Sequence, residues 1–425
     1  MTNHELPALT LAQKLIAKAA GRDRVAVGEI VNCKVDMAMF HDSSGPRRLK
    51  PMLEELGASI WDKSKVVLVM DHYVPEQDED SRRIVRIARD WAREQHLPHV
   101  YDSIGICHVV VPQKGHICPG MFCVGGDSHS PTGGAFGAYM FGIGSTEMLG
   151  VMVTGEIWVR VPETLRMQWN NRLSPGVTAK DMMLHMIGLL GMNGGQYQAV
   201  EFCGSAVQAL SMQERMTLSN MSAEIGAQVG LIAPDQTTRE WLAGAGVPQV
   251  DTDAWYTDEG ASSHDHVFNA SSLAPQVAAP HSPANTRGVQ DFSEVRVDVA
   301  YIGACTGAKL DDLRAAAQVL KGRRIASGVC LMVAPASLQD QQQAEQEGIM
   351  GVLRDAGAEV LPTGCGACAG YGGSIPDGVN VIATTARNFK GRMGSATAQV
   401  YLASPYTVAA SAVRGLITDP REVLA

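Results

Sequence analysis

Blocks of apolar residues alternate with amphipathic blocks in the first part of the chain. Residues 65–70 form a nearly continuous apolar run after the opening lysine, which is typical of a buried parallel strand. Residues 81–95 follow with helical periodicity and many charges, and residues 108–111 and 121–124 predict two further short strands. Strands that alternate with helices in this way indicate a layered α/β fold.

The pattern changes twice further along. Residues 165–255 are mixed, with helices predicted at 180–190 and 212–229. Residues 257–293 are rich in Asp, Ser, His, Ala and Pro and have little periodicity, so we expect them to connect two domains over the surface.

Regular patterning returns near Val295. Strands are predicted at 295–302, 329–334 and 379–384, with a helix at 309–320. We therefore expect three α/β domains, with boundaries at 1–164, 165–293 and 294–425.

Composition limits the possible partners and the location. A chain of 425 residues is long enough for about two or three domains. The net charge of −9 and the lack of long Lys or Arg runs argue against nucleic acid or an anionic membrane as the main partner. We expect neither a signal peptide nor a membrane span, and nine cysteines are too few for a disulfide scaffold. A cytoplasmic protein with reduced thiols is expected.

Three cysteines lie in glycine-rich segments. Cys365 and Cys368 form a C-x-x-C motif between Gly364 and Gly370, and Cys305 follows a predicted strand and precedes a predicted helix. Such segments suit an iron–sulfur cluster, because thiolates bind iron and small neighbours let backbone N–H groups approach the sulfides. From spacing alone, a zinc site, a redox pair and structural thiols remain open alternatives.

The other cysteines have plainer interpretations. Small or apolar neighbours predict core positions for Cys33, Cys203 and Cys330. A second group stands near His108 and His116, where a zinc site is an alternative to strands and a turn; it consists of Cys107, Cys118 and Cys123.

Acid–histidine pairs follow two of the predicted strands. Asp71-His72 and Asp127-Ser128-His129 would lie at carboxyl ends, where α/β sheets bind ligands. Each motif suits acid–base chemistry, and the alternative is that each is only a capped loop. Asp127-Ser128-His129 is not a serine-hydrolase triad, because the side chains of neighbouring residues point in different directions.

Two further pairs are weaker signals. Asn220 and Glu224 would share one helix face, which is usually solvated. Arg387 and Arg392 flank a glycine-containing loop that could grip carboxylates, or could simply be surface.

Taken together, these motifs resemble the aconitase superfamily, in particular separate large subunits of the 3-isopropylmalate dehydratase type. The matching segments follow the family's order over nearly the whole chain. They are Asp71-His72, His108 and residues 126–134, 141–144, 220–227, 280–283, 302–306, 364–368 and 387–392.

The resemblance implies three α/β domains around one [4Fe–4S] cluster, without the family's swivelling fourth domain. It implies that Cys305, Cys365 and Cys368 bind the cluster and leave one iron without cysteine. The implied acid–base network comprises Asp71, His72, His108, Asp127, His129 and Glu224. The implied substrate-binding residues are Ser128, Arg387 and Arg392, with Asn220 beside the cluster.

The implied activity is that of a hydro-lyase or isomerase on a small hydroxy di- or tricarboxylic acid. In this family, a proton-abstracting serine and a further arginine come from the small swivelling domain. No segment before Ala425 matches that domain, so we expect a separate small subunit as partner. The two alternatives are a sensor that responds to cluster loss and a catalytically dead, zinc-stabilised scaffold.

Three positions depart from the family's pattern. Ala304 stands where Ser is common, Gly307 where Asn is common, and Ala386 where Asn is common. The departures cast doubt on leucine biosynthesis as the role. The expected substrate class therefore includes 3-isopropylmalate, 2,3-dimethylmalate, citramalate or maleate, and homocitrate.

Overall fold

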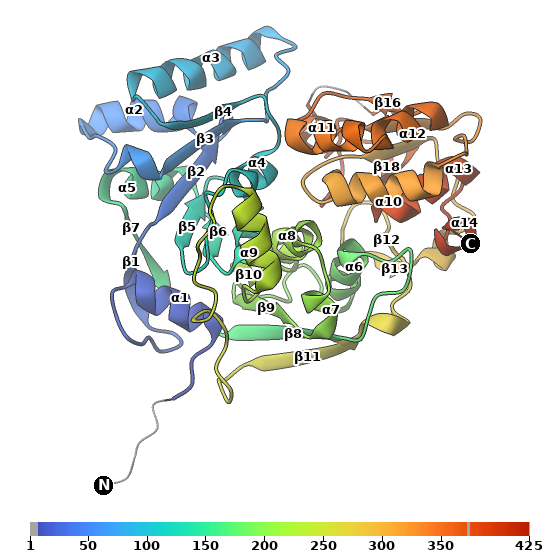
Figure 1. Ribbon diagram of the computed structural model, residues 1–425. Helices are drawn as coiled ribbons and strands as arrows, with labels where there is room; N and C mark the ends of the chain where they lie inside the picture. Colours follow the sequence, from blue (N-terminus) through green and yellow to red (C-terminus); the bar gives the residue numbers. More distant parts are fainter. Residues whose placement is uncertain (1–6, 372–374, 425) are drawn as a thin grey trace.

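The computed structural model describes residues 7–371 and 375–424 (Figure 1). Within these ranges the strands form three main sheets and a two-stranded ribbon. In Figure 1 the first sheet, coloured blue to teal, lies at the left, the green-to-yellow second sheet below, and the yellow-to-red third sheet at the right. This arrangement confirms the expected α/β fold class.

The first sheet is parallel throughout, in the order β4-β3-β2-β5-β6. Its strands are β2 (Met37–His41), β3 (Val66–Met70), β4 (His99–Asp102), β5 (Phe122–Gly125) and β6 (Tyr139–Gly142). Its helices are α1 (Leu11–Ala19), α2 (Pro46–Leu56), α3 (Glu79–Glu94), α4 (Cys107–Gln113) and α5 (Ser145–Thr154). The apolar run predicted as a strand is β3, buried along its length between β2 and β4.

The segment predicted as a strand at 108–111 is instead helix α4. The prediction was wrong because a run of β-branched residues was taken as a strand, whereas all seven residues of α4 are buried and therefore need no polar face. The carboxylate of Asp71 accepts the backbone N–H of Cys107 at 2.7 Å and so caps the first turn.

The ribbon and the second sheet follow. An antiparallel pair joins β1 (Ile30–Lys34) to β7 (Glu156–Arg160). The second sheet is parallel in the order β10-β9-β8-β11, with β8 (Thr164–Asn170), β9 (Ala199–Cys203), β10 (Val229–Leu231) and β11 (His264–Asn269). Its helices are α6 (Ala179–Leu190), α7 (Ser205–Gln208), α8 (Met212–Met221) and α9 (Gln236–Gly244).

The helix predicted at 212–229 ends early. Helix α8 stops at Met221, a 3₁₀ turn η3 (Ser222–Ile225) follows, and Gly226 with φ 74° turns the chain into β10. The other 3₁₀ turns are η1 (Lys63–Lys65), η2 (Ser130–Phe136), η4 (Ala270–Ser272), η5 (Val289–Phe292) and η6 (Gly366–Ala369).

The third sheet has the order β13-β12-β18-β17-β14-β15-β16. Its strands are β12 (Gln276–Ala278), β13 (Thr286–Gly288), β14 (Val299–Ile302), β15 (Cys330–Val333), β16 (Glu359–Val360), β17 (Asn380–Ala383) and β18 (Gln399–Ala403). Its helices are α10 (Leu310–Leu320), α11 (Leu338–Gln346), α12 (Ile349–Ala356), α13 (Pro405–Arg414) and α14 (Arg421–Leu424). The strands and the helix predicted after residue 295 are all present.

The segment 257–293 is more ordered than predicted. Strand β11 joins the second sheet beside β8, while β12 and β13 extend the third sheet antiparallel to β18. Strand β12 is buried along its length, so this part of the connection does not run over the surface. The three strands are short and are stabilised by backbone pairing with distant strands, which leaves little periodicity in the sequence.

The first and third sheets touch close to the end of β15. A β-bridge pairs Gly105 with Ser337, and the backbone N–H of Ile106 donates to the carbonyl of Ala336 at 2.9 Å. Gly105 has φ 138°, and a Cβ there would lie 2.6 Å from the Cα of Ser337. Only glycine permits this approach without a shift of the backbone.

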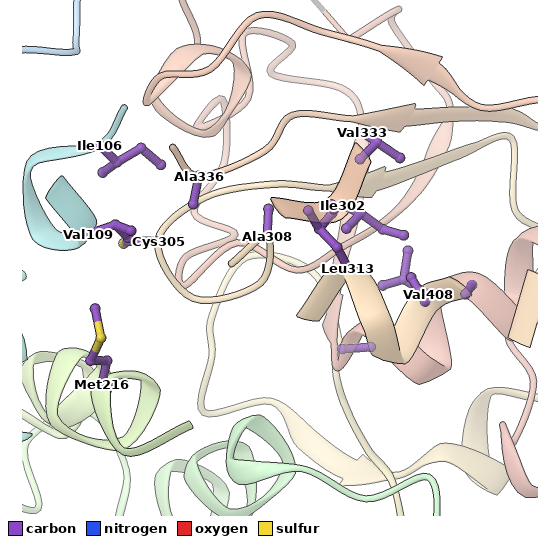
Figure 2. Close-up of a cluster of buried hydrophobic side chains, with 14 of the residues drawn as sticks. Ile106, Val109, Met216, Ile302, Cys305, Ala308, Leu313, Val333, Ala336 and Val408 are labelled. Carbon is purple, nitrogen blue, oxygen red and sulfur yellow. The ribbon is translucent and has the colours of Figure 1, made fainter. Parts of the chain in front are cut away.

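One buried cluster continues across this contact. Figure 2 shows part of this cluster. Ile106 and Val109 come from the region of α4, Met216 from α8, and Ile302 and Cys305 from the end of β14 and the loop after it. Cys305 therefore lies at the edge of a core to which all three parts contribute. No described helix combines the length and the apolar character that a membrane crossing requires.

Candidate active site

Polar residues gather where parallel strands of two sheets end. Asp71-His72 follows β3 and Asp127-Ser128-His129 comes shortly after β5, while Cys305 and Arg387 follow β14 and β17 of the third sheet. A cavity of about 470 Å³ opens between them. The predicted site residues that line it are His72, His108, Asp127, Ser128, His129, Cys305, Cys365, Cys368, Arg387 and Arg392.

Asp71 lies behind the wall and orients His72. Its Oδ1 meets Nδ1 of His72 at 2.7 Å, and its Oδ2 accepts the Cys107 N–H. Burial opposes ionisation of both groups, but their mutual attraction outweighs burial; the pKa of His72 rises to about 9 and that of Asp71 falls to about 2. The pair is thus a buried imidazolium–carboxylate at neutral pH.

Asp127 stands at the centre of the histidines. Its Oδ1 lies 2.8 Å from Nε2 of His108 and accepts the backbone N–H of His129 at 2.8 Å. Burial would raise the pKa of Asp127, but the adjacent His108 and the hydrogen bonds hold it well below its usual range. Asp127 is therefore an anion that holds the imidazole of His108 and the backbone of His129.

Glu224 connects the histidines to an arginine. It is buried in η3, and its Oε1 lies 2.9 Å from Nε2 of His129 and 2.7 Å from Nε of Arg387. These contacts lower the pKa of Glu224 against the opposing effect of burial. Arg387 also donates through Nη1 to Ser128 Oγ at 2.9 Å, so the three sheets meet in one network.

The three cysteines of the resemblance share the cavity. Cys305 comes from the loop after β14, and Cys365 and Cys368 come from the segment around η6. Asn220 donates to Cys305 Sγ at 3.3 Å, and the N–H of Cys365 donates to the carbonyl of Asp71 at 2.9 Å. Burial raises the pKa of Cys305 to about 12, while Cys365 lowers that of Cys368 to about 6.

These donors fit a cluster held by three thiolates. Asn220 offers an N–H to one sulfur, and the cationic Arg392 lies against Cys368, where its buried Nε has no hydrogen-bond partner. Sites that bind anions need such donors and charges close to sulfur. Within residues 7–371 and 375–424, two sets of His and Asp side chains lie close enough together to hold a metal ion. The first set is His41, Asp42, Asp71 and His72, and the second is His108, Asp127 and His129.

Comparison with known proteins agrees with this geometry. The model of the aconitase family (aconitate hydratase) matches residues 13–294 and 285–415. The chain belongs to the aconitase family. The fold class and the expectation of an aconitase-type hydro-lyase are thereby confirmed.

Among similar proteins, the 3-isopropylmalate dehydratase large subunit 1 of Methanopyrus kandleri is 43% identical over 98% of this chain and 99% of its own length. The 3-isopropylmalate dehydratase large subunit of Desulfatibacillum aliphaticivorans is 39% identical over 98% of this chain and 100% of its own. The solved aconitase X of Thermococcus kodakaraensis has a TM-score of 0.51 at 12% identity, covering 91% and 92% of the two chains, and supports the fold alone.

Two residues of this aconitase-family site were missed in the sequence. His41 and Asp42 end β2, and the His41 ring stacks on His72 with centroids 3.8 Å apart. The N–H of Ser43 lies 3.2 Å from Nδ1 of His41, and Nε2 of His41 lies 3.6 Å from Asp127 Oδ2. The available signal was an acid–histidine pair at the end of a strand, the same signal as Asp71-His72.

One departure from the family's pattern has a structural explanation. A Cβ at position 307 would lie 2.1 Å from Cβ of Thr384, whose hydroxyl donates to the carbonyl of Gly303 and accepts its N–H, each at 2.8 Å. Gly307 is therefore required by Thr384. Ala304, with φ 69°, and Ala386 both line the cavity, and the structure does not explain why alanine stands at either position.

The remaining cysteines correct some expectations. Cys33 is buried as predicted, but Cys203 is only half-buried, and Cys330 is exposed because it opens strand β15 at the surface. No metal-binding group of described residues includes the three cysteines near His108 and His116, which are Cys107, Cys118 and Cys123. His116 pairs with the hydroxyl of Tyr101 at 2.6 Å.

Proposed function

We propose that this chain is the large subunit of a [4Fe–4S]-dependent hydro-lyase that adds or removes water at a small hydroxy di- or tricarboxylic acid. One observation carries the proposal: three thiols share a cavity with an ionised Asp–His network and two arginines. The names of the relatives favour 3-isopropylmalate as substrate. The wider class also includes 2,3-dimethylmalate, citramalate or maleate, and homocitrate.

Cys305, Cys365 and Cys368 would hold the cluster, leaving one iron without cysteine. When bound, that iron supplies a Lewis acid for the hydroxyl that leaves. The guanidinium groups of Arg387 and Arg392 would bind the carboxylates of the substrate in forked pairs.

His72 would supply the proton to the leaving hydroxyl. Asp71 fixes the Nδ1–H of His72, so Nε2 is the ring atom that can deliver a proton into the cavity. A pKa of about 9 keeps this proton in place at neutral pH until the substrate develops negative charge. Asp127 and Glu224 would hold His108 and His129 in position around it.

The relatives are named large subunits, and a small subunit is therefore the proposed partner. It would bring the missing proton-abstracting base and close the open side of the cavity. Exclusion of water by this closure would strengthen each charge interaction within the cavity.

The test is turnover by the chain combined with its small subunit. Anaerobic assays with iron and sulfide would screen the four substrate classes, comparing wild type with Cys365→Ser. The exposed Cys330→Ser is the matched control. We expect at least one substrate to be dehydrated by wild type and by the control but not by Cys365→Ser. Absence of turnover with every substrate, or full activity of Cys365→Ser, would contradict the proposal.

A further inference from the structure

Lys180 is a buried lysine beneath the loop that carries Cys305. It comes from the first turn of α6 and is 1% exposed. Its Nζ donates to the carbonyls of Thr384 and Thr385, each at 2.6 Å, and to Thr306 Oγ1 at 3.3 Å. All three hydrogen-bond acceptors are neutral, so the ammonium receives hydrogen bonds but no opposite charge from them.

Other buried cations of the chain have a carboxylate of their own. Lys309 donates to the carbonyl of Cys305 at 3.0 Å and forms an ion pair with Asp312 at 2.7 Å. Arg215 is equally buried and pairs with Asp235 at 2.7 Å. Over the described part of the chain, Lys180 forms no such ion pair. Burial lowers the pKa of Lys180 to about 7 despite the attraction of Asp312, so a fully charged Lys180 at neutral pH needs a further anion close by.

The contacts of Lys180 indicate where that anion would lie. Thr306 directly follows Cys305, and Thr384-Thr385 lead into the loop of Arg387. Both loops border the cavity that the three thiols share. Three thiolates around a cluster would bring net negative charge to the far side of these loops.

We infer that Lys180 is the buried positive charge that balances the thiolate-bound cluster, and that it is a positioning residue that raises the reduction potential of the cluster and slows its loss. The inference rests on the proposed function, because the cluster supplies the anion. Reduction adds one electron to the cluster, and a nearby cation stabilises the added charge. Removal of the cation therefore disfavours the reduced state.

Lys180 also ties two loops together, and a purely structural role has to be separated from the electrostatic one. Lys180→Met removes the charge and keeps an unbranched chain. Lys180→Arg keeps the charge, and Lys180→Gln keeps a hydrogen-bond donor without charge, which provides a second neutral variant if Lys180→Met does not fold. The matched control is Arg215→Met combined with Asp235→Asn, which removes an ion pair of a buried cation whose hydrogen bonds do not reach the Cys305 loop.

The measurement is a dithionite titration of the anaerobically reconstituted chain, followed by electron paramagnetic resonance, together with the rate of cluster bleaching in air. We expect Lys180→Met and Lys180→Gln to lower the midpoint potential and to accelerate bleaching several-fold. Lys180→Arg and the paired control should stay close to wild type in midpoint potential. Equal potentials in wild type and both neutral variants, with cluster bound in each, would overturn this inference alone. Failure of wild type to bind a cluster would overturn the proposed function as well.

Discussion

Glu224→Gln is the most informative single substitution, because it changes the charge of the site and little else. Glu224 is 1% exposed, and its Oε1 receives both Nε2 of His129 at 2.9 Å and Nε of Arg387 at 2.7 Å. The amide keeps one oxygen in place but cannot carry the negative charge. The lowered pKa of Glu224 means that the fold favours its carboxylate over the neutral form.

The magnitude follows from these two contacts. A hydrogen bond to a charged group contributes about 1.5–3 kcal/mol, roughly twice a neutral one. Replacing the carboxylate by an amide removes the extra strength that the charge gives to both hydrogen bonds, a loss of about 2 kcal/mol in stability. Breaking a buried ion pair completely costs about 3–5 kcal/mol, which sets the upper bound. We therefore expect unfolding by urea to become easier by about 2–4 kcal/mol. Turnover should fall about 10²–10⁴-fold, because His129 and Arg387 lose their orientation.

Glu214→Gln is the matched control; Glu214 lies in helix α8, which directly precedes the turn that carries Glu224. Burial and the nearby Asp311 raise the pKa of Glu214 to about 7, so there the fold disfavours the carboxylate. The same chemical change should leave stability unchanged or increase it at pH above about 7. Urea unfolding of both variants, measured side by side, compares the change in stability that each substitution causes. A loss below about 0.5 kcal/mol in Glu224→Gln, or equal losses in both variants, would refute the reasoning.

Three further predictions follow from single contacts. The pKa of His72 is about 9 in the folded protein against 6.5 in the free side chain. Its stabilising contribution is therefore present below about pH 6.5 and is lost as pH rises through about 9. The free energies of unfolding of wild type and His72→Asn, measured with urea, should become equal by about pH 10. Gly105→Ala should destabilise by at least about 2 kcal/mol in thermal unfolding, whereas Gly150→Ala, with open space on α5, should be neutral or up to about 1 kcal/mol more stable. Arg387→Lys loses the planar fork and should raise KM about tenfold or more, and an unchanged KM would count against carboxylate binding there.

The sequence predicted the elements whose burial leaves a regular pattern. Strand β3 is buried on both faces, and α3 shows an apolar stripe, so their positions could be read directly. Helix α4 could not, because it is buried all round and its β-branched residues are typical of strands. Tertiary contacts overrode local propensity at that point.

The site was predictable only as far as its motifs. Asp71-His72 and Asp127-Ser128-His129 could be placed at strand ends, but Glu224 and Arg387 are 163 residues apart in the chain, and no periodicity announces their contact. Asn220 and Glu224 were expected to share one helix face, usually solvated, but α8 ends at Met221, Glu224 lies in the following 3₁₀ turn, and both side chains are buried. Such contacts arise from the packing of three sheets and need the fold itself.

The most direct test of the central claim is the Mössbauer spectrum of the chain reconstituted with ⁵⁷Fe and sulfide. Three cysteines facing about four irons predict three similar sites and one distinct site, and only the distinct site should change when substrate is added with the small subunit. Cys305→Ser should lose iron, while Cys330→Ser should retain it. Four equivalent irons, no bound iron, or a spectrum that substrate leaves unchanged would contradict the account.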